Sequence, residues 1–270
     1  MLKDVLTLSV LQGVAEFLPI SSSGHLQLGK LLLNLPDIGI RLDIFLHLGT
    51  LLAVFVFYWA IIRRLVCGCL GLSGEEEARA AWLYALKIFL SAIPVGLVGI
   101  WFKDSIGSSF SNSRLVGGAL IFTGLVLLLT SLLPKGKGSV SFFSALGMGF
   151  AQAIAILPGV SRSGMTLAAA RTMKVEPSAS AEFSFLMSAP PILGAALLEI
   201  LKALRGSEAG LEGAAAASEV SWVLCGVGAL VAAMVGYFAL KLLVSSLKGR
   251  YFWLFGPYCL LAGLLTLFLV

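Results

Sequence analysis

Long apolar runs alternate with short polar segments along this chain. Each run is close to the roughly 20 residues that an α-helix needs to cross ~30 Å of hydrocarbon. The six longest lie near 43–62, 81–102, 114–133, 182–201, 220–243 and 251–270. Unbroken runs of this length predict helices rather than the short alternating strands of a barrel. The pattern therefore predicts an all-α integral membrane protein with six transmembrane spans.

Two further apolar segments, 4–34 and 141–173, are interrupted by proline and serine. Proline ends a helix, and serine caps the start of the next one. We therefore expect each segment to form a re-entrant broken-helix pair, which enters the membrane and returns to the side from which it came.

The two interrupted segments resemble each other at a constant spacing. Gln12 precedes Gln152 by 140 residues, and the stretch Ser21 to Gly24 precedes the stretch Ser161 to Gly164 by the same 140 residues. Matches between glycines of the apolar runs keep this offset within a residue. A single match between small residues would mean little, but several in register along the chain indicate an internal repeat.

The repeat divides the chain into two domains, 1–135 and 136–270, each with one re-entrant pair and three spans. Because a copy with three spans crosses the membrane an odd number of times, the second copy is predicted to be inverted relative to the first. Inverted repeats place broken helices and a polar site near the middle of the membrane. We expect the two interruptions to face each other there across a pseudo-twofold axis.

Composition agrees with a membrane protein, because 59% of the residues are hydrophobic, only 12% are charged and the mean hydropathy is +0.99. A soluble domain carries about a quarter charged residues. The net charge of +5 is spread over connecting segments, which indicates membrane topology and contact with anionic lipids rather than nucleic acid binding. With the N-terminus outside, the loops on the cytoplasmic side hold more lysine and arginine than the opposite loops. This orientation opens the first interruption to the extracytoplasmic side.

Gln12 and Glu16 are four residues apart and share one face of the predicted helix. A carboxylate at membrane depth costs about 2.5 to 3.5 kcal/mol on insertion scales, so Glu16 should face a polar cavity or a partner. One alternative is an interhelical hydrogen bond. The serines Ser21, Ser22 and Ser23 then precede a new helix start, where free N–H groups and the helix dipole favour an anion. Ordinary capping is the alternative for them.

The second interruption replaces the middle serine with Arg162, between Ser161 and Ser163. A guanidinium stays charged and matches phosphate oxygens with two donors at once. Thr166, four residues later, is predicted to point its hydroxyl toward the same anion. A structural ion pair between Arg162 and Glu16 is the alternative, and both roles are compatible.

The chain has two histidines, His25 and His47. His25 lies three residues after Ser22, and an imidazole has a pKa suited to a general base near neutral pH. His47 lies four residues after Asp43, and we interpret these two as a structural pair on one helix face.

Together these residues predict an anion site between lipid-facing helices, and a phosphorylated lipid suits it, with its head in the polar break and its tail between spans. An enzyme acting on that lipid and a flippase or transporter of an anionic isoprenyl lipid both fit the site. A non-enzymatic scaffold has less need of the carboxylate.

Two motifs resemble those of the bacterial undecaprenyl-diphosphate phosphatases, also called bacitracin-resistance proteins. The first is Gln12-Gly-Val-Ala-Glu16-Phe-Leu-Pro-Ile-Ser-Ser-Ser-Gly-His25, and the second is Leu157-Pro-Gly-Val-Ser-Arg-Ser-Gly-Met-Thr166. The resemblance implies hydrolysis of an isoprenyl diphosphate lipid to the monophosphate and phosphate, which recycles the carrier of peptidoglycan synthesis in the bacterial inner membrane. It also implies a divalent cation (Mg or Ca) and a homodimer.

The resemblance further implies roles for single residues. Ser22 is implied as the nucleophile, His25 as its neighbour in proton transfer and Arg162 as the holder of the diphosphate. Glu16 is implied to handle a metal or a proton, with Gln12 as its companion in the metal site. The chain departs from the family pattern at Gln12, where many relatives have Glu, and at positions 43 and 47, where the pattern has Glu and Gln.

Overall fold

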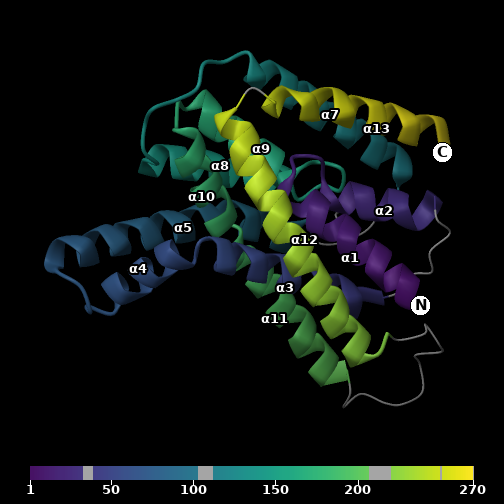
Figure 1. Ribbon diagram of the computed structural model, residues 1–270, viewed down its shortest axis with the longest axis horizontal. Helices are drawn as coiled ribbons and strands as arrows, with labels where there is room; N and C mark the ends of the chain where they lie inside the picture. Colours follow the sequence, from purple (N-terminus) through teal and green to yellow (C-terminus); the bar gives the residue numbers. More distant parts are fainter. Residues whose placement is uncertain (33–38, 103–111, 207–219, 250, 270) are drawn as a thin grey trace.

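The computed structural model describes residues 1–32, 39–102, 112–206, 220–249 and 251–269 (Figure 1). Within these ranges the regular elements are helices, and one isolated bridge joins Gly138 to Val175. The predicted all-α class is confirmed. The helices in chain order are α1 Leu2–Phe17, α2 Ser22–Leu32, α3 Gly39–Phe57, α4 Trp59–Cys69, α5 Glu75–Trp101, α7 Ser113–Ser131, α8 Phe142–Ile154, α9 Arg162–Thr172, α10 Pro177–Leu186, α11 Ala189–Gly206, α12 Trp222–Lys248, η1 Phe252–Leu254 and α13 Phe255–Leu269.

Five helical segments of the described chain are long and apolar enough to cross a membrane, which makes this a multi-pass membrane protein. They are Glu75–Trp101, Ser113–Ser131, Pro177–Leu198, Trp222–Lys248 and Phe252–Leu269.

The sixth expected span, near 43–62, is not one straight helix. α3 and α4 meet at an angle of 81° around Tyr58, and the two together count as at most one span. α4 carries the exposed residues Arg63 and Arg64, and its other side packs against α5. The cost of placing two arginines among lipid tails explains why the helix turns here instead of continuing.

Both predicted interruptions are present as breaks between helices. α1 ends at Phe17 before α2 begins at Ser22, and α8 ends at Ile154 before α9 begins at Arg162. α1 packs along α12, whereas α8 packs along α5, so the first helix of each half rests on a long helix of the other half (Figure 1). The inverted topology, the return of each pair to its own side and the boundary at residue 135 stay predictions, and residues 33 and 34 of the first pair lie outside the described ranges.

α7 and α13 lie side by side and have the most extensive contact of any helix pair among the described residues (Figure 1). A Cβ atom added at Gly124 would lie 2.8 Å from the carbonyl oxygen of Gly256, and one added at Gly263 would lie 2.6 Å from that of Gly117. Small residues are what allow two membrane helices to approach this closely. The pair matters for the site because each of its two helices makes hydrogen bonds to one of the interruptions, as described below.

Replacing Gly124 with alanine is expected to lower the free energy of unfolding by about 1 to 3 kcal/mol, because the methyl group overpacks the contact with α13. Gly118 lies on the same helix with open space around its Cα, so Gly118→Ala is the matched control and should be neutral or slightly stabilising. Thermal unfolding of the two variants in detergent measures the difference. Equal midpoints would show that α7 and α13 do not need this close approach.

Candidate functional site

The two interruptions touch each other inside the protein. The Ser163 hydroxyl donates to the carbonyl of Leu18 at 3.2 Å, and the backbone N–H of Gly159 donates to the Ser23 hydroxyl at 3.5 Å. A Cβ atom added at Gly24 would lie only 3.3 Å from the Cα of Gly159. Segments about 140 residues apart in sequence therefore form one continuous site.

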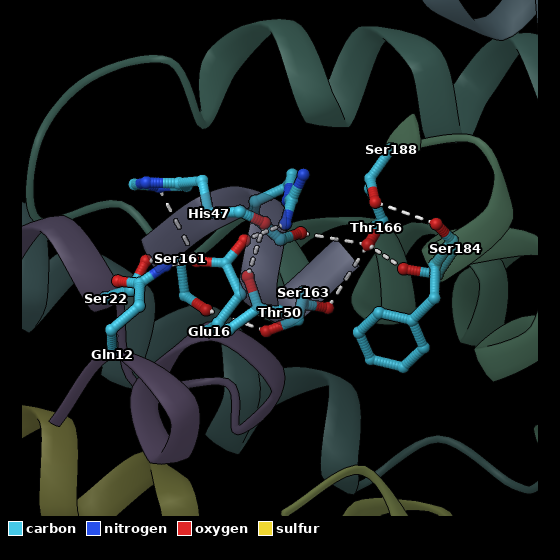
Figure 2. A network of polar contacts seen from close by, with 12 residues as sticks. Gln12, Glu16, Ser22, His47, Thr50, Ser161, Ser163, Thr166, Ser184 and Ser188 are labelled. Carbon is cyan, nitrogen blue, oxygen red and sulfur yellow. Dashed lines mark hydrogen bonds and ion pairs between the residues drawn. The ribbon is translucent and has the colours of Figure 1, made fainter. Parts of the chain in front are cut away.

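Glu16 is the centre of this site (Figure 2). Its Oε1 atom accepts from Nη2 of Arg162, and its Oε2 atom accepts from the Ser22 hydroxyl at 2.6 Å and from Nε2 of Gln12 at 3.0 Å. The ion pair predicted as an alternative for Arg162 is thus present. The Glu16 side chain is 5% exposed, so these partners replace the water that the carboxylate loses on burial.

The start of α9 places Arg162 beside Glu16. Arg162 is the first residue of α9, immediately after its N-cap residue Ser161, so its side chain leaves the helix at the end that carries free N–H groups. The ion pair engages Nη2, and the guanidinium has further donors in its planar fork. The arrangement places a fixed positive charge and a helix N-terminus at one point, which suits an anion.

His47 of α3 is a site residue that the sequence interpretation missed. Its Nε2 atom lies 3.9 Å from Oε2 of Glu16 (Figure 2). Its Nδ1 atom is 2.8 Å from the backbone carbonyl of Asp43. The expected pairing with Asp43 therefore involves the backbone, while the Asp43 carboxylate lies 3.5 Å from Nζ of Lys30. A spacing of four residues predicted the local contact, but only the packing of α3 against α1 could place His47 beside Glu16.

Four of the serines predicted to bind phosphate make hydrogen bonds within the protein. The Ser21 hydroxyl accepts from the N–H of Gly24 at 3.3 Å, and that of Ser161 accepts from the N–H of Gly164 at 3.1 Å. The remaining two, Ser23 and Ser163, each lie within 3.3 Å of a capping serine and also bond the opposite interruption, as given above. Capping, the alternative named from the sequence, is present at both helix starts. Phosphate binding by these serines stays a prediction.

Thr166 points away from the Glu16 carboxylate. Its hydroxyl bonds the carbonyl of Arg162 at 2.9 Å and the hydroxyl of Ser184 on α10 at 2.6 Å, and the side chain is fully buried (Figure 2). The structure thus joins Thr166 to α10, and its predicted contact with the anion would need another rotamer.

His25 bonds Ser21 and Tyr258 rather than Ser22. Its Nδ1 atom lies 2.9 Å from the carbonyl of Ser21, and its Nε2 atom lies 2.8 Å from the hydroxyl of Tyr258 on α13. Among the site residues, Glu16 is the one that accepts the Ser22 proton in a hydrogen bond. The structure thus places a carboxylate where the sequence interpretation expected an imidazole.

α7 and α13 each contribute a side chain that bonds the backbone of one interruption. On α7, the Thr123 hydroxyl donates to the carbonyl of Gly159 at 3.3 Å and accepts from the N–H of Ser161 at 3.1 Å. On α13, the Cys259 thiol lies 3.4 Å from the carbonyl of Pro19. Sequence reasoning missed both side chains, because a threonine or cysteine inside an apolar run has no local signal of such a role.

The residues around Glu16 fit a hard divalent cation. Oε1 of Gln12 is buried and has no hydrogen-bond partner among the described residues, and it belongs to the side chain that already contacts Glu16. Carboxylate and amide oxygens suit Mg²⁺ or Ca²⁺. The described ranges contain no group of three or more His, Cys, Asp or Glu side chains around a common point. A cation held by Gln12 and Glu16 would therefore complete its shell with water and phosphate oxygens, as Mg²⁺ commonly does.

The family model of the bacitracin resistance protein BacA matches residues 5–265. The chain belongs to this family. A relative from Halothermothrix orenii named undecaprenyl-diphosphatase is 38% identical over 268 residues, with 98% of this chain and 96% of the relative covered. Relatives with the same name from Parabacteroides distasonis and Moorella thermoacetica are 34% and 38% identical over 267 residues, and each alignment covers at least 96% of both chains. The matched region contains both interruptions and every side chain described in this site.

Proposed function

We propose that this protein is a membrane phosphatase that hydrolyses undecaprenyl diphosphate to undecaprenyl phosphate and inorganic phosphate. The observation that carries the proposal is the group formed by Ser22, Glu16 and Arg162, in which a hydroxyl donates to a buried carboxylate at 2.6 Å beside a guanidinium. The names of the relatives support the substrate, and they support hydrolysis rather than transport. Such a reaction recycles the lipid carrier of cell-wall synthesis, which accounts for resistance to bacitracin.

Ser22 attacks the terminal phosphorus of the diphosphate. As its Oγ forms the new O–P bond, its proton moves to Oε2 of Glu16, and the P–O bond to the lipid phosphate breaks. The lipid monophosphate leaves and takes up the proton that Glu16 had accepted. Water then attacks the phosphoserine while Glu16 takes a proton from that water, and this proton returns to Oγ of Ser22 as its bond to phosphorus breaks. Arg162 and the N-terminus of α9 neutralise charge on the transferred phosphoryl oxygens, which is the main requirement of phosphoryl transfer.

Attack by a water molecule that Glu16 activates would give the same products. In that case Ser22 orients the carboxylate and makes no bond to phosphorus. The two routes differ in whether a phosphoserine forms, and the Discussion describes the experiment that separates them.

A divalent cation, Mg²⁺ or Ca²⁺, would be held by Gln12 and Glu16. When bound, it would supply positive charge to the phosphate oxygens of the substrate. Substituting the amide of Gln12 by the carboxylate in Gln12→Glu should therefore tighten cation binding, which calorimetry with Mg²⁺ in detergent measures independently of turnover.

The site is proposed to open to the extracytoplasmic side of the bacterial inner membrane, in line with the distribution of basic loops. Single cysteines introduced at Lys3 and Lys137 should then react with an impermeant reagent from opposite sides. Equal labelling of both positions from one side would exclude this topology.

Release of phosphate from a long-chain isoprenyl diphosphate by the purified protein in detergent tests the proposed activity. A transporter needs two compartments, whereas a phosphatase releases phosphate in detergent, without a membrane potential. Absence of release from a folded protein supplied with Mg²⁺ or Ca²⁺ would refute the function.

A further inference from the structure

α13 holds the first interruption at two adjacent residues. The hydroxyl of Tyr258 lies 2.8 Å from Nε2 of His25, and the thiol of Cys259 lies 3.4 Å from the carbonyl of Pro19. The rings of His25 and Tyr258 are nearly parallel, at 13°, with centroids 5.5 Å apart. α13 is thus connected to both sides of Ser22, the first residue of α2, although more than 230 residues separate the contacting residues in sequence.

The hydrogen-bond partners of His25 define its tautomer. The carbonyl of Ser21 can only accept, so the proton must be on Nδ1 of His25, which is 2.9 Å from that carbonyl. In the neutral ring, Nε2 then has a lone pair and accepts from the hydroxyl of Tyr258. Both nitrogens of a neutral imidazole are therefore engaged.

Ser21 has an unusual backbone conformation that needs support. Its φ is 71°, in the left-handed region, and among the described residues other than glycine only Lys174 shares this property. Such a conformation is strained in a residue other than glycine and persists only where the surroundings hold it. The Ser21 carbonyl accepts from the backbone N–H of His25 at 3.1 Å and from Nδ1 of its ring at 2.9 Å, so the ring adds to the support of the residue just before Ser22.

We propose that Tyr258 and His25 form a neutral brace, which holds the Ser21 peptide and thereby aims the Ser22 hydroxyl at Glu16. Tyr258 is then a positioning residue for the reaction, and His25 acts through Ser21 instead of accepting the proton of Ser22. This inference rests on the proposed phosphatase function and adds to it how the Ser22 hydroxyl is positioned.

Tyr258→Phe removes one hydroxyl and keeps the ring. A net hydrogen bond is worth about 1 kcal/mol, so kcat should fall about fivefold while KM stays within about twofold. The pH dependence of kcat should keep its shape, because the proton acceptor is unchanged. Tyr251 is an exposed tyrosine beside η1, and Tyr251→Phe is the matched control, which should match the wild type.

Two substitutions of His25 distinguish a brace from a base. Asparagine can place an N–H near the position of Nδ1 but cannot accept a proton near neutral pH, whereas alanine does neither. A brace predicts that His25→Asn keeps about a tenth of wild-type kcat and that His25→Ala falls at least tenfold further. Equal loss in the two folded variants, or an unchanged kcat in Tyr258→Phe, would overturn the inference and leave the phosphatase function standing.

Nitrogen NMR of histidine-labelled protein gives a readout that does not depend on turnover. The chain has two histidines, so His47→Gln assigns the signals. His25 should appear as the neutral Nδ1–H tautomer, and Tyr258→Phe should shift its Nε2 resonance. The other tautomer, or no shift in that variant, would contradict the brace. If the wild type released no phosphate, the proposed function would be refuted. The NMR measurement would still show whether Tyr258 donates a hydrogen bond to Nε2 of His25.

Discussion

Arg162→Ala is expected to reduce phosphate release about a thousandfold. Arg162 is the fixed cation nearest to the Ser22 and Glu16 pair, and loss of a single donor that stabilises transition-state charge costs about 10² to 10³ in rate. Arg162→Lys keeps the charge but loses the planar fork, so it should recover only part of the activity.

The same substitution has a second effect, because it leaves the Glu16 carboxylate buried without its cation. Breaking one partner of such a pair costs about 3 to 5 kcal/mol of stability. Adding Glu16→Gln to Arg162→Ala removes the unpaired charge and should restore part of the melting temperature without restoring activity. Phosphate release and thermal unfolding in detergent, with exposed Arg63→Ala as control, measure the two effects separately.

A folded Arg162→Ala protein that retained more than a tenth of wild-type turnover would show that Arg162 serves the structure alone. The melting temperature of Arg162→Ala itself makes this outcome recognisable, since it separates a loss of folding from a loss of chemistry.

Ser22→Ala is expected to lower turnover by about four orders of magnitude or more, because it removes the group that forms the covalent bond. Stability should change by only about 1 kcal/mol, since Ser22 is half-buried and loses one hydrogen bond. Rapid quenching of the wild type with substrate labelled in the terminal phosphate should trap label on the peptide that contains Ser22.

Ser23→Ala is the matched control for this experiment, because it makes the same change one residue later, where the hydroxyl bonds the N–H of Gly159. It should lose about tenfold at most and still form the phosphoserine. Near-normal turnover of Ser22→Ala, or no label on Ser22 in the wild type, would assign the attack to water activated by Glu16.

Local chemistry made the two interruptions predictable. Pro19 and Pro158 are each followed within a few residues by serine and glycine, a combination that favours the end of one helix and the start of the next, so the breaks near 18–21 and 155–161 could be located from sequence. The contact between Arg162 and Glu16 was foreseeable as well, because a buried carboxylate needs a cation and the repeat placed one in the matching motif.

The contacts of the two histidines with other helices could not be predicted from the sequence. His25 lies three residues from Ser22 in the chain, yet its ring contacts Tyr258 of α13, and His47 contacts Glu16 across the packing of α3 on α1. Sequence spacing reports which residues share a helix face. It does not report which distant helix covers that face.

The bend of 81° between α3 and α4 is a second feature that the sequence pattern did not predict. The apolar run near 43–62 is long enough for a span, but Arg63 and Arg64 follow it, and the positions of α4 and α5 decide where the chain turns.

The sequence by itself determined that this is a helical membrane protein with two serine-rich helix breaks, with Glu16 beside the first and Arg162 in the second. These features follow from hydropathy, proline and intramembrane charge, whose effects act through neighbouring residues. Only the tertiary structure decided that Glu16 rather than His25 accepts the bond from Ser22, and that α7 and α13 hold the breaks in place. Those outcomes depend on interhelical packing, which is the sum of contacts between residues far apart in the chain.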